Sequence, residues 1–119
     1  MSADEDAIAV AAELESGDEP QRIPTQLVYE LYVGVGYTEQ TADEVAKIRS
    51  VLDSRPVVPL TDEIARQAGR IDGQLRRDGD RVGQGDITIA ATAIRHGEAV
   101  VTGNPDDFRR IPDVSVREY

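Results

Sequence analysis

The sequence has no cysteine and no tryptophan, a single histidine, a single lysine (Lys47) and few aromatic residues. Without cysteine the chain cannot form disulfides, zinc–thiolate sites, iron–sulfur clusters or a cysteine nucleophile. One histidine is too few for a His-rich metal site, and a His-based triad is hard to build around it. Any chemistry must therefore depend on carboxylates, hydroxyls or arginine.

Long apolar stretches are also missing. No run of 18 or more apolar residues is present, so we expect no membrane span. No basic and apolar leader opens the sequence, which gives no support for secretion and favours a cytoplasmic protein. The length of 119 residues fits one domain with a core of its own, and we expect residues 1–119 to form that single domain.

Acidic residues dominate the charge. The chain has 23 Asp and Glu against 13 Lys and Arg, for a net charge of −10. A surface rich in acid and poor in lysine is typical of proteins in concentrated salt, so we expect a halophilic source; an ordinary acidic bacterial protein is the alternative. Acidity disfavours nucleic-acid binding at low salt, where cationic contacts supply much of the affinity. That objection weakens at molar salt, where the screening length falls to about 3 Å.

The order of the segments predicts an α/β domain with a parallel β-sheet, because helical and strand patterns alternate along the chain. Apolar spacing, capping residues and glycine stops predict helices over 4–16, 25–33, 41–52 (with Thr38 as an alternative start), 61–75 and 86–96, and a helical turn over 104–108. Short strands are predicted over 20–24, 56–60, 99–102 and 114–116, and the strands at 56–60 and 99–102 are expected to be buried. Residues 77–85 are expected to form a polar loop.

Three carboxylates are candidates for a metal site. Asp107 follows the strand that ends at Thr102, and Asp86 begins the helix that leads into this strand. Glu30 stands in an otherwise apolar helix, where an unpaired carboxylate is costly. Ligands of parallel sheets bind beyond the carboxyl ends of the strands, and oxygen donors suit Mg²⁺ or Mn²⁺.

Each of these residues has a plainer interpretation. Glu30 could pair with an arginine or face water, Asp86 could be only a helix N-cap, and Asp107 could be part of a turn. Arginines 76, 77 and 81 flank the polar loop, where they could contact phosphate or form ion pairs with Asp78 and Asp80. His96 is interpreted as a favourable partner of its helix C-terminus.

Three motifs together resemble the PIN-domain nucleases of the VapC toxin type. They are Tyr29–Gly34, Gly85–Ala93, and Val100–Phe108 followed by Ile111-Pro112. The resemblance implies a PIN-like three-layer domain, with a parallel β-sheet flanked by helices, and a Mg²⁺- or Mn²⁺-dependent endoribonuclease of a toxin–antitoxin pair. Glu30, Asp86 and Asp107 match three of the family's metal-binding carboxylates, and Thr102, Asn104 and Asp106 line the site. The implied partners are an RNA substrate, often transfer RNA, a cognate antitoxin and a second copy in a homodimer.

The family's first strand, which is central in the sheet and carries a further acidic ligand, has no counterpart in the sequence. We therefore expect an N-terminally truncated copy. A misplaced start codon is the preferred explanation; a decaying gene and a partner chain that fills the gap are the alternatives. Two other functions stay open, namely a non-catalytic PIN scaffold that acts through protein contacts and an unrelated acidic α/β binding module. No glycine-rich phosphate loop is present to support nucleotide binding.

Overall fold

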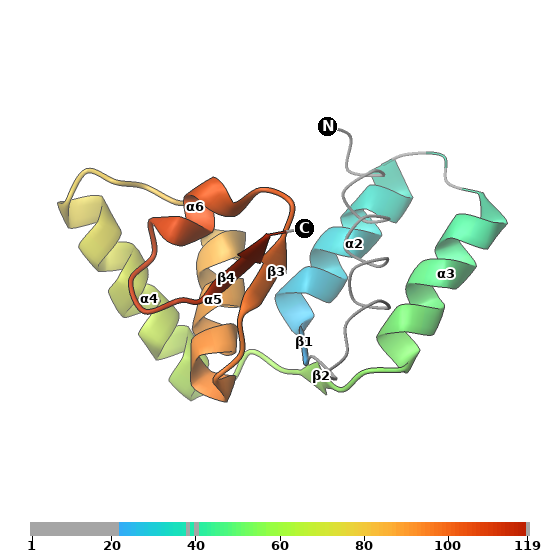
Figure 1. Cartoon of the computed structure of the whole chain (residues 1–119), viewed down its shortest axis with the longest axis horizontal. Coiled ribbons are helices and arrows are strands. Elements are labelled where there is room, and N and C mark those ends of the chain that lie inside the picture. Colours follow the sequence, from blue (N-terminus) through green and yellow to red (C-terminus); the bar gives the residue numbers. More distant parts are fainter. Residues whose placement is uncertain (1–21, 38, 40, 119) are drawn as a thin grey trace. The chain divides into compact units, whose positions relative to one another are not determined.

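The computed structural model describes residues 22–37, 39 and 41–118, and these form parts of two compact units, residues 1–58 and 59–119 (Figure 1). Each unit is described by itself. The helix expected over residues 4–16 and the start of the strand expected at 20–24 lie outside the described residues. Within the described part, no helix is long and apolar enough to cross a membrane.

In its described residues, 22–37, 39 and 41–58, the first unit pairs two short parallel strands with two helices. Its elements are β1 (Ile23–Pro24), α2 (Thr25–Tyr37), α3 (Ala42–Asp53) and β2 (Val57–Val58). Ile23 of β1 lies opposite Val57 of β2 in a parallel register. The two helices and β1 share a small apolar core of Ile23, Leu31, Ile48, Val51 and Leu52. This core holds α2, which carries Glu30, against α3.

Helix α2 is longer than predicted. It was expected to stop at Gly34, but it continues through Gly34 and Gly36 to Tyr37. Gly34 is buried, and a glycine inside a helix costs only about 1 kcal/mol relative to alanine, which packing can offset. The helix begins at Thr25, whose hydroxyl donates a hydrogen bond to the Val58 carbonyl over 3.4 Å and so ties the helix start to β2.

Helix α3 begins where its capping residues predict. The Thr41 hydroxyl accepts a hydrogen bond from the Glu44 backbone, and the Glu44 carboxylate accepts one from the Thr41 backbone. This reciprocal pair satisfies two amides of the first turn. The strand expected next, over 56–60, is shorter, and its expected burial is wrong, because Val57 and Leu60 are both 45% exposed.

The second unit contains α4 (Asp62–Arg77), α5 (Gln84–His96), β3 (Val100–Thr102), α6 (Pro105–Arg109) and β4 (Val116–Glu118). Strands β3 and β4 are parallel, with Val100 opposite Val116. Helix α5 contacts α4, β3 and α6, so it is central to the unit. Its buried face (Ile87, Ala90 and Ala91) explains why the sequence there is almost wholly small or apolar.

Local signals explain the start of α4 and the end of α5. Thr61 caps α4, its hydroxyl accepting a hydrogen bond from the Ile64 backbone, and Gly97 ends α5 in the left-handed conformation at φ 66°. The start of α5 differs from the prediction. The helix begins at Gln84 with Gly83 as its N-cap, so the interpretation of Asp86 as an N-cap is wrong.

Both strand pairs are parallel, which confirms the prediction of an α/β fold with parallel strands. Within the part of the chain that the structure describes, the strands form two separate pairs, one in each unit, where one continuous sheet was expected. The short helix expected near Asn104 and the buried strand before it are present as α6 and β3.

Candidate metal centre

Asp86 lies in the first turn of α5 and is half-buried. The exposed amides at a helix N-terminus carry partial positive charge, which favours an ionised carboxylate at this position. Because the next residues of α5 are packed in the core of the unit, the backbone that carries Asp86 is fixed. Asp86 is thus carried by a well-packed element, as a metal ligand requires.

The connection from β3 to α6 brings the other candidate residues of this unit together. Thr102 is the last residue of β3 and is buried, and its hydroxyl accepts a hydrogen bond of 3.0 Å from the Asn104 backbone amide. Asn104 is the exposed N-cap residue of α6, although its side chain makes no capping hydrogen bond. Thr102 therefore does more than end a strand, because it fixes the turn that leads to the acidic residues of α6.

Asp106 and Asp107 both lie in the first turn of α6 but differ in surroundings. Asp106 is exposed, whereas Asp107 is half-buried. Pro105 and Phe108, on either side of the acidic pair, are buried and anchor the helix. Of the two carboxylates, Asp107 is therefore the less exposed to water, and its helix contacts α5.

An arginine that the sequence analysis did not single out contacts Asp107. Nη1 of Arg110 lies 3.2 Å from Oδ1 of Asp107. The same guanidinium donates to the Asp80 carboxylate and, through Nη2, to the Arg81 carbonyl over 2.8 Å. The hydrogen bond to Asp80 is the main reason that the pKa of Arg110 rises above its usual value. The i to i+3 spacing from Asp107 was the one available signal for this contact.

The ion pairs expected around the loop at 77–85 are different from those observed. Asp80 pairs with Arg110, while Arg76 pairs with Asp72, one turn earlier in α4, over 2.8 Å. The Arg76 hydrogen bond lowers the pKa of Asp72. The predicted pairing of Arg76 with Asp78 or Asp80 is therefore wrong, since intrahelical spacing selects Asp72.

Glu30 lies in the first unit, on α2, and is half-buried. Its Oε2 accepts a hydrogen bond of 3.0 Å from the side-chain amide of Gln26, one turn earlier. The partner is a neutral amide, where one alternative interpretation expected an arginine. A neutral donor orients the carboxylate but does not itself neutralise its charge.

The described residues place Asp86, Thr102, Asn104, Asp106 and Asp107 in the second unit and Glu30 in the first. Among residues 22–37, 39 and 41–118, no three His, Asp or Glu side chains are grouped closely enough to hold a metal ion. The donor set itself consists of carboxylate, hydroxyl and amide oxygens, which fits a hard cation such as Mg²⁺ or Mn²⁺.

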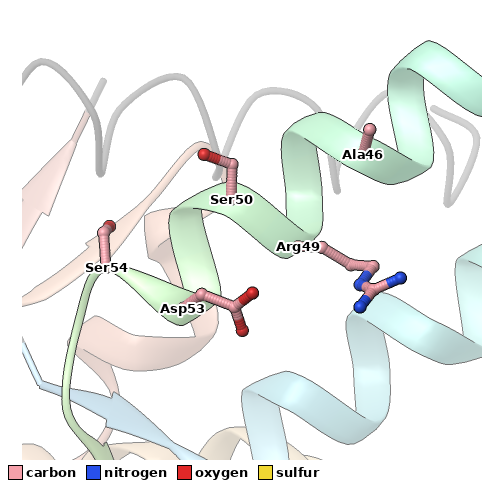
Figure 2. A pocket seen from close by; sticks show the side chains of 5 residues that line it. All are labelled: Ala46, Arg49, Ser50, Asp53 and Ser54. Carbon is pink, nitrogen blue, oxygen red and sulfur yellow. The ribbon is translucent and has the colours of Figure 1, made fainter.

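A surface hollow lies elsewhere, along α3 of the first unit. It is lined by Ala46, Arg49, Ser50, Asp53 and Ser54. Figure 2 shows these side chains on successive turns of α3 and at its end, with a single carboxylate, Asp53, among them. Because the lining includes none of the candidate ligands, this hollow is separate from the candidate metal residues.

Comparison with known proteins places these residues in context. The family model described as PIN domain matches residues 1–114. The chain is 31% identical over 84 residues to ribonuclease VapC2 of Haemophilus influenzae, covering 71% of this chain and 64% of that protein. It is 36% identical over 94 residues to ribonuclease VapC5 of Mycobacterium tuberculosis, covering 75% and 68%. The fold resembles the DNA-bound VapBC structure from Salmonella typhimurium, with a TM-score of 0.78 and 25% identity, covering 92% of this chain and 83% of that one.

These matches bear on the expected truncation. The chain spans 64% of the length of the Haemophilus influenzae relative. The family model nevertheless matches from residue 1 onward, so the expectation that the family's first strand is missing from this chain is not supported.

Proposed function

Because the chain belongs to the PIN-domain family and to its VapC group, we propose that it is a Mg²⁺-dependent endoribonuclease of a toxin–antitoxin pair. Both relatives compared above are described as ribonucleases. The family model covers residues from both compact units, which supports their acting together as a single domain over residues 1–119. Membership of this family also replaces the earlier alternative of an unrelated acidic binding module.

The proposed centre uses Glu30, Asp86 and Asp107 as ligands of Mg²⁺ or Mn²⁺. The observation that carries the proposal is the pair of half-buried carboxylates, Asp86 and Asp107, on the first turns of two contacting helices. A bound cation would lower the pKa of a coordinated water, orient the phosphodiester and offset the negative charge that develops on it. The cation would also reduce the electrostatic repulsion between the negatively charged chain and RNA.

The remaining residues of the site have supporting roles. The α5 N-terminus favours the ionised form of Asp86, and the Thr102–Asn104 hydrogen bond fixes the turn that presents Asp107. Asn104 and Asp106 are exposed beside this turn, where they can contact RNA or a metal-bound water. Each of these residues lies on a helix or strand, or directly before a helix, so little reorganisation is needed at the reaction.

The test is cleavage of RNA by the purified chain with Mg²⁺ or Mn²⁺, and with EDTA. We expect Asp107→Asn to lower the cleavage rate by on the order of 100-fold, since loss of a ligand removes several kcal/mol of charge stabilisation. Asp62→Asn, which removes an exposed carboxylate from the first turn of α4, outside the proposed site, is the matched control and should stay within a few-fold of the unmodified chain. Equal rates for Asp107→Asn and the unmodified chain would rule out this assignment.

A non-catalytic scaffold is the second candidate. Two observations favour it: Asp107 is already paired with Arg110, and the described residues contain no group of three metal-ligating side chains. A scaffold would keep the fold and the protein contacts but would neither bind Mn²⁺ tightly nor cleave RNA at any metal concentration. Calorimetric titration with Mn²⁺ distinguishes the enzyme from the scaffold. Only the enzyme is expected to bind Mn²⁺ stoichiometrically, and Asp107→Asn should weaken that binding.

The proposed partners follow from the family. The similar structure from Salmonella typhimurium is a VapBC complex bound to DNA, which supports a cognate antitoxin for this chain as well. RNA, including transfer RNA, is the proposed substrate, and a homodimer the proposed assembly. A halophilic source and a cytoplasmic location stay predictions from the sequence.

A further inference from the structure

The guanidinium of Arg110 uses all three of its nitrogen atoms in contacts with two separate segments. Nε donates a hydrogen bond to the Asp80 carboxylate, with which Nη2 forms an ion pair, and Nη2 also donates to the Arg81 carbonyl over 2.8 Å. Nη1 is the nitrogen that contacts Asp107. Two residues of the loop between α4 and α5, Asp80 and Arg81, therefore fix the guanidinium that also contacts Asp107 on α6.

The contact with Asp107 involves one carboxylate oxygen. Nη1 of Arg110 lies 3.2 Å from Oδ1 of Asp107. Within the described part of the chain, Oδ2 of Asp107 forms no hydrogen bond or ion pair. A carboxylate held through one oxygen has a defined orientation, and its second oxygen is left without a protein contact in the described part of the chain. The side chains of Arg110 and Asp107 are 37% and 45% exposed. An ion pair this exposed adds little to the stability of the fold, so its main effect is on the orientation of the carboxylate.

The charge of Arg110 is also compensated. A lone guanidinium beside a cation site would repel the cation, but Asp80 contacts the guanidinium more closely than Asp107 does. Together, Asp80 and Arg110 are neutral, and the repulsion is correspondingly small. The arrangement therefore differs from an arginine that simply occupies the metal position.

We propose that Arg110, anchored by Asp80 and the Arg81 carbonyl, is a positioning residue that orients the Asp107 carboxylate toward the bound cation. This inference rests on the proposed function and assigns roles to two residues outside its ligand set. The alternative is an ion pair that only competes with the metal for Asp107. The two ideas predict opposite signs, because removing a competitor strengthens cation binding and removing a positioning residue weakens it.

The experiment is calorimetric titration of Mn²⁺ into the full chain and into single variants. Arg110→Gln is expected to weaken Mn²⁺ binding by about 10-fold, the lower end of the usual effect of residues that orient metal ligands. Asp80→Asn, which leaves Arg110 in place but removes its anchor, is expected to weaken binding in the same direction. Arg109→Gln is the matched control, because Arg109 pairs with Glu118 and should leave Mn²⁺ binding unchanged.

The electron paramagnetic resonance spectrum of the bound Mn²⁺ distinguishes a positioning role of Arg110 from a merely structural one. A variant that only destabilises the fold binds less Mn²⁺ with the same spectrum, whereas a reoriented Asp107 changes the spectrum of the bound ion. We expect that change in Arg110→Gln and Asp80→Asn and an unaltered spectrum in Arg109→Gln.

Unchanged or tighter Mn²⁺ binding in Arg110→Gln overturns the inference, and so does an equal loss in Arg109→Gln. If Asp107→Asn abolishes binding while Arg110→Gln does not affect it, the proposed metal centre stands and the positioning role is wrong. If the unmodified chain binds no Mn²⁺, both fail.

Discussion

The carboxylate of Asp86 can be removed without removing a helix cap, because Gly83 occupies the N-cap position of α5. Its expected contribution to stability through the helix dipole is no more than about 1 kcal/mol. We therefore predict that Asp86→Asn loses most of its Mn²⁺ affinity while the chain stays folded, since the N-cap is kept and the lost dipole contribution is small. Calorimetry and urea denaturation measure the affinity and the stability, with Asp62→Asn in the first turn of α4 as the control for a general loss of charge.

Asp86→Asn that binds Mn²⁺ as tightly as the unmodified chain would contradict the assignment of this ligand. A large loss of stability would instead indicate that the carboxylate has a structural role in α5.

At the same scale, the acidic candidates could be predicted from the sequence, but the contact of Arg110 with Asp107 was not predicted. Asp86 and Asp107 stand next to helix and strand boundaries that local patterns reveal. Arg110 contacts Asp80, thirty positions earlier, and such a contact depends on how α4, α5 and α6 pack. Pattern spacing carries no information on a side-chain contact of that kind, so the three-way arrangement around Arg110 had to come from the structure.

Among the elements, α4 offers a direct test of how glycine affects helix stability. Gly69 lies in its interior, is exposed, and has nothing within 4 Å of the position that a Cβ would occupy. We predict that Gly69→Ala raises the free energy of unfolding by about 0.5–1 kcal/mol, because alanine loses less backbone entropy in a helix. Thermal or urea denaturation of the full chain measures the change.

Gly97 is the matched control, since a Cβ there also meets nothing within 4 Å, but its φ of 66° suits glycine. Gly97→Ala should lower stability, since a side chain is strained in the left-handed region. Stabilisation by both substitutions would show that the backbone at the end of α5 is not left-handed.

Element boundaries were predictable where a local signal was unambiguous. Thr41 and Thr61 each start a helix, and Gly97 ends one, because capping acts within a few residues. The end of α2 was not predictable, because Gly34 is buried inside the helix and packing there overrides a weak local preference. The exposure of Val57 likewise depends on which strands pair, which an apolar run does not reveal.

For the whole molecule, net charge is the dominant property. At −10 the folded chain repels itself, and compaction increases that repulsion. Raising KCl from 0.1 to 1 M shortens the screening length from about 10 Å to about 3 Å, so the repulsion is reduced. We predict that the midpoint of thermal unfolding rises across this range. A falling midpoint would show that the surface ion pairs outweigh the repulsion and would count against a halophilic source.

The class of the fold was predictable at this scale, and the composition limits the donors of the proposed metal site. Alternating helical and strand segments indicated parallel strands, and the absence of cysteine with a single histidine left oxygen ligands for any metal. The division into two compact units was not predictable, because no glycine- or serine-rich linker marks Val58 and Pro59, where they meet in sequence. Glu30 belongs to the first unit, whereas Asp86 and Asp107 belong to the second.

The central claim is that Glu30, Asp86 and Asp107 hold one cation, and paramagnetic broadening by Mn²⁺ tests it most directly. In an amide NMR spectrum of the full chain, less than one equivalent of Mn²⁺ should broaden the signals of these three residues together. The first turn of α4, which carries Asp62 and Glu63, should be affected only at higher Mn²⁺ concentration. Broadening at Asp86 and Asp107 without Glu30, or equal broadening at every acidic turn, would contradict the shared metal centre.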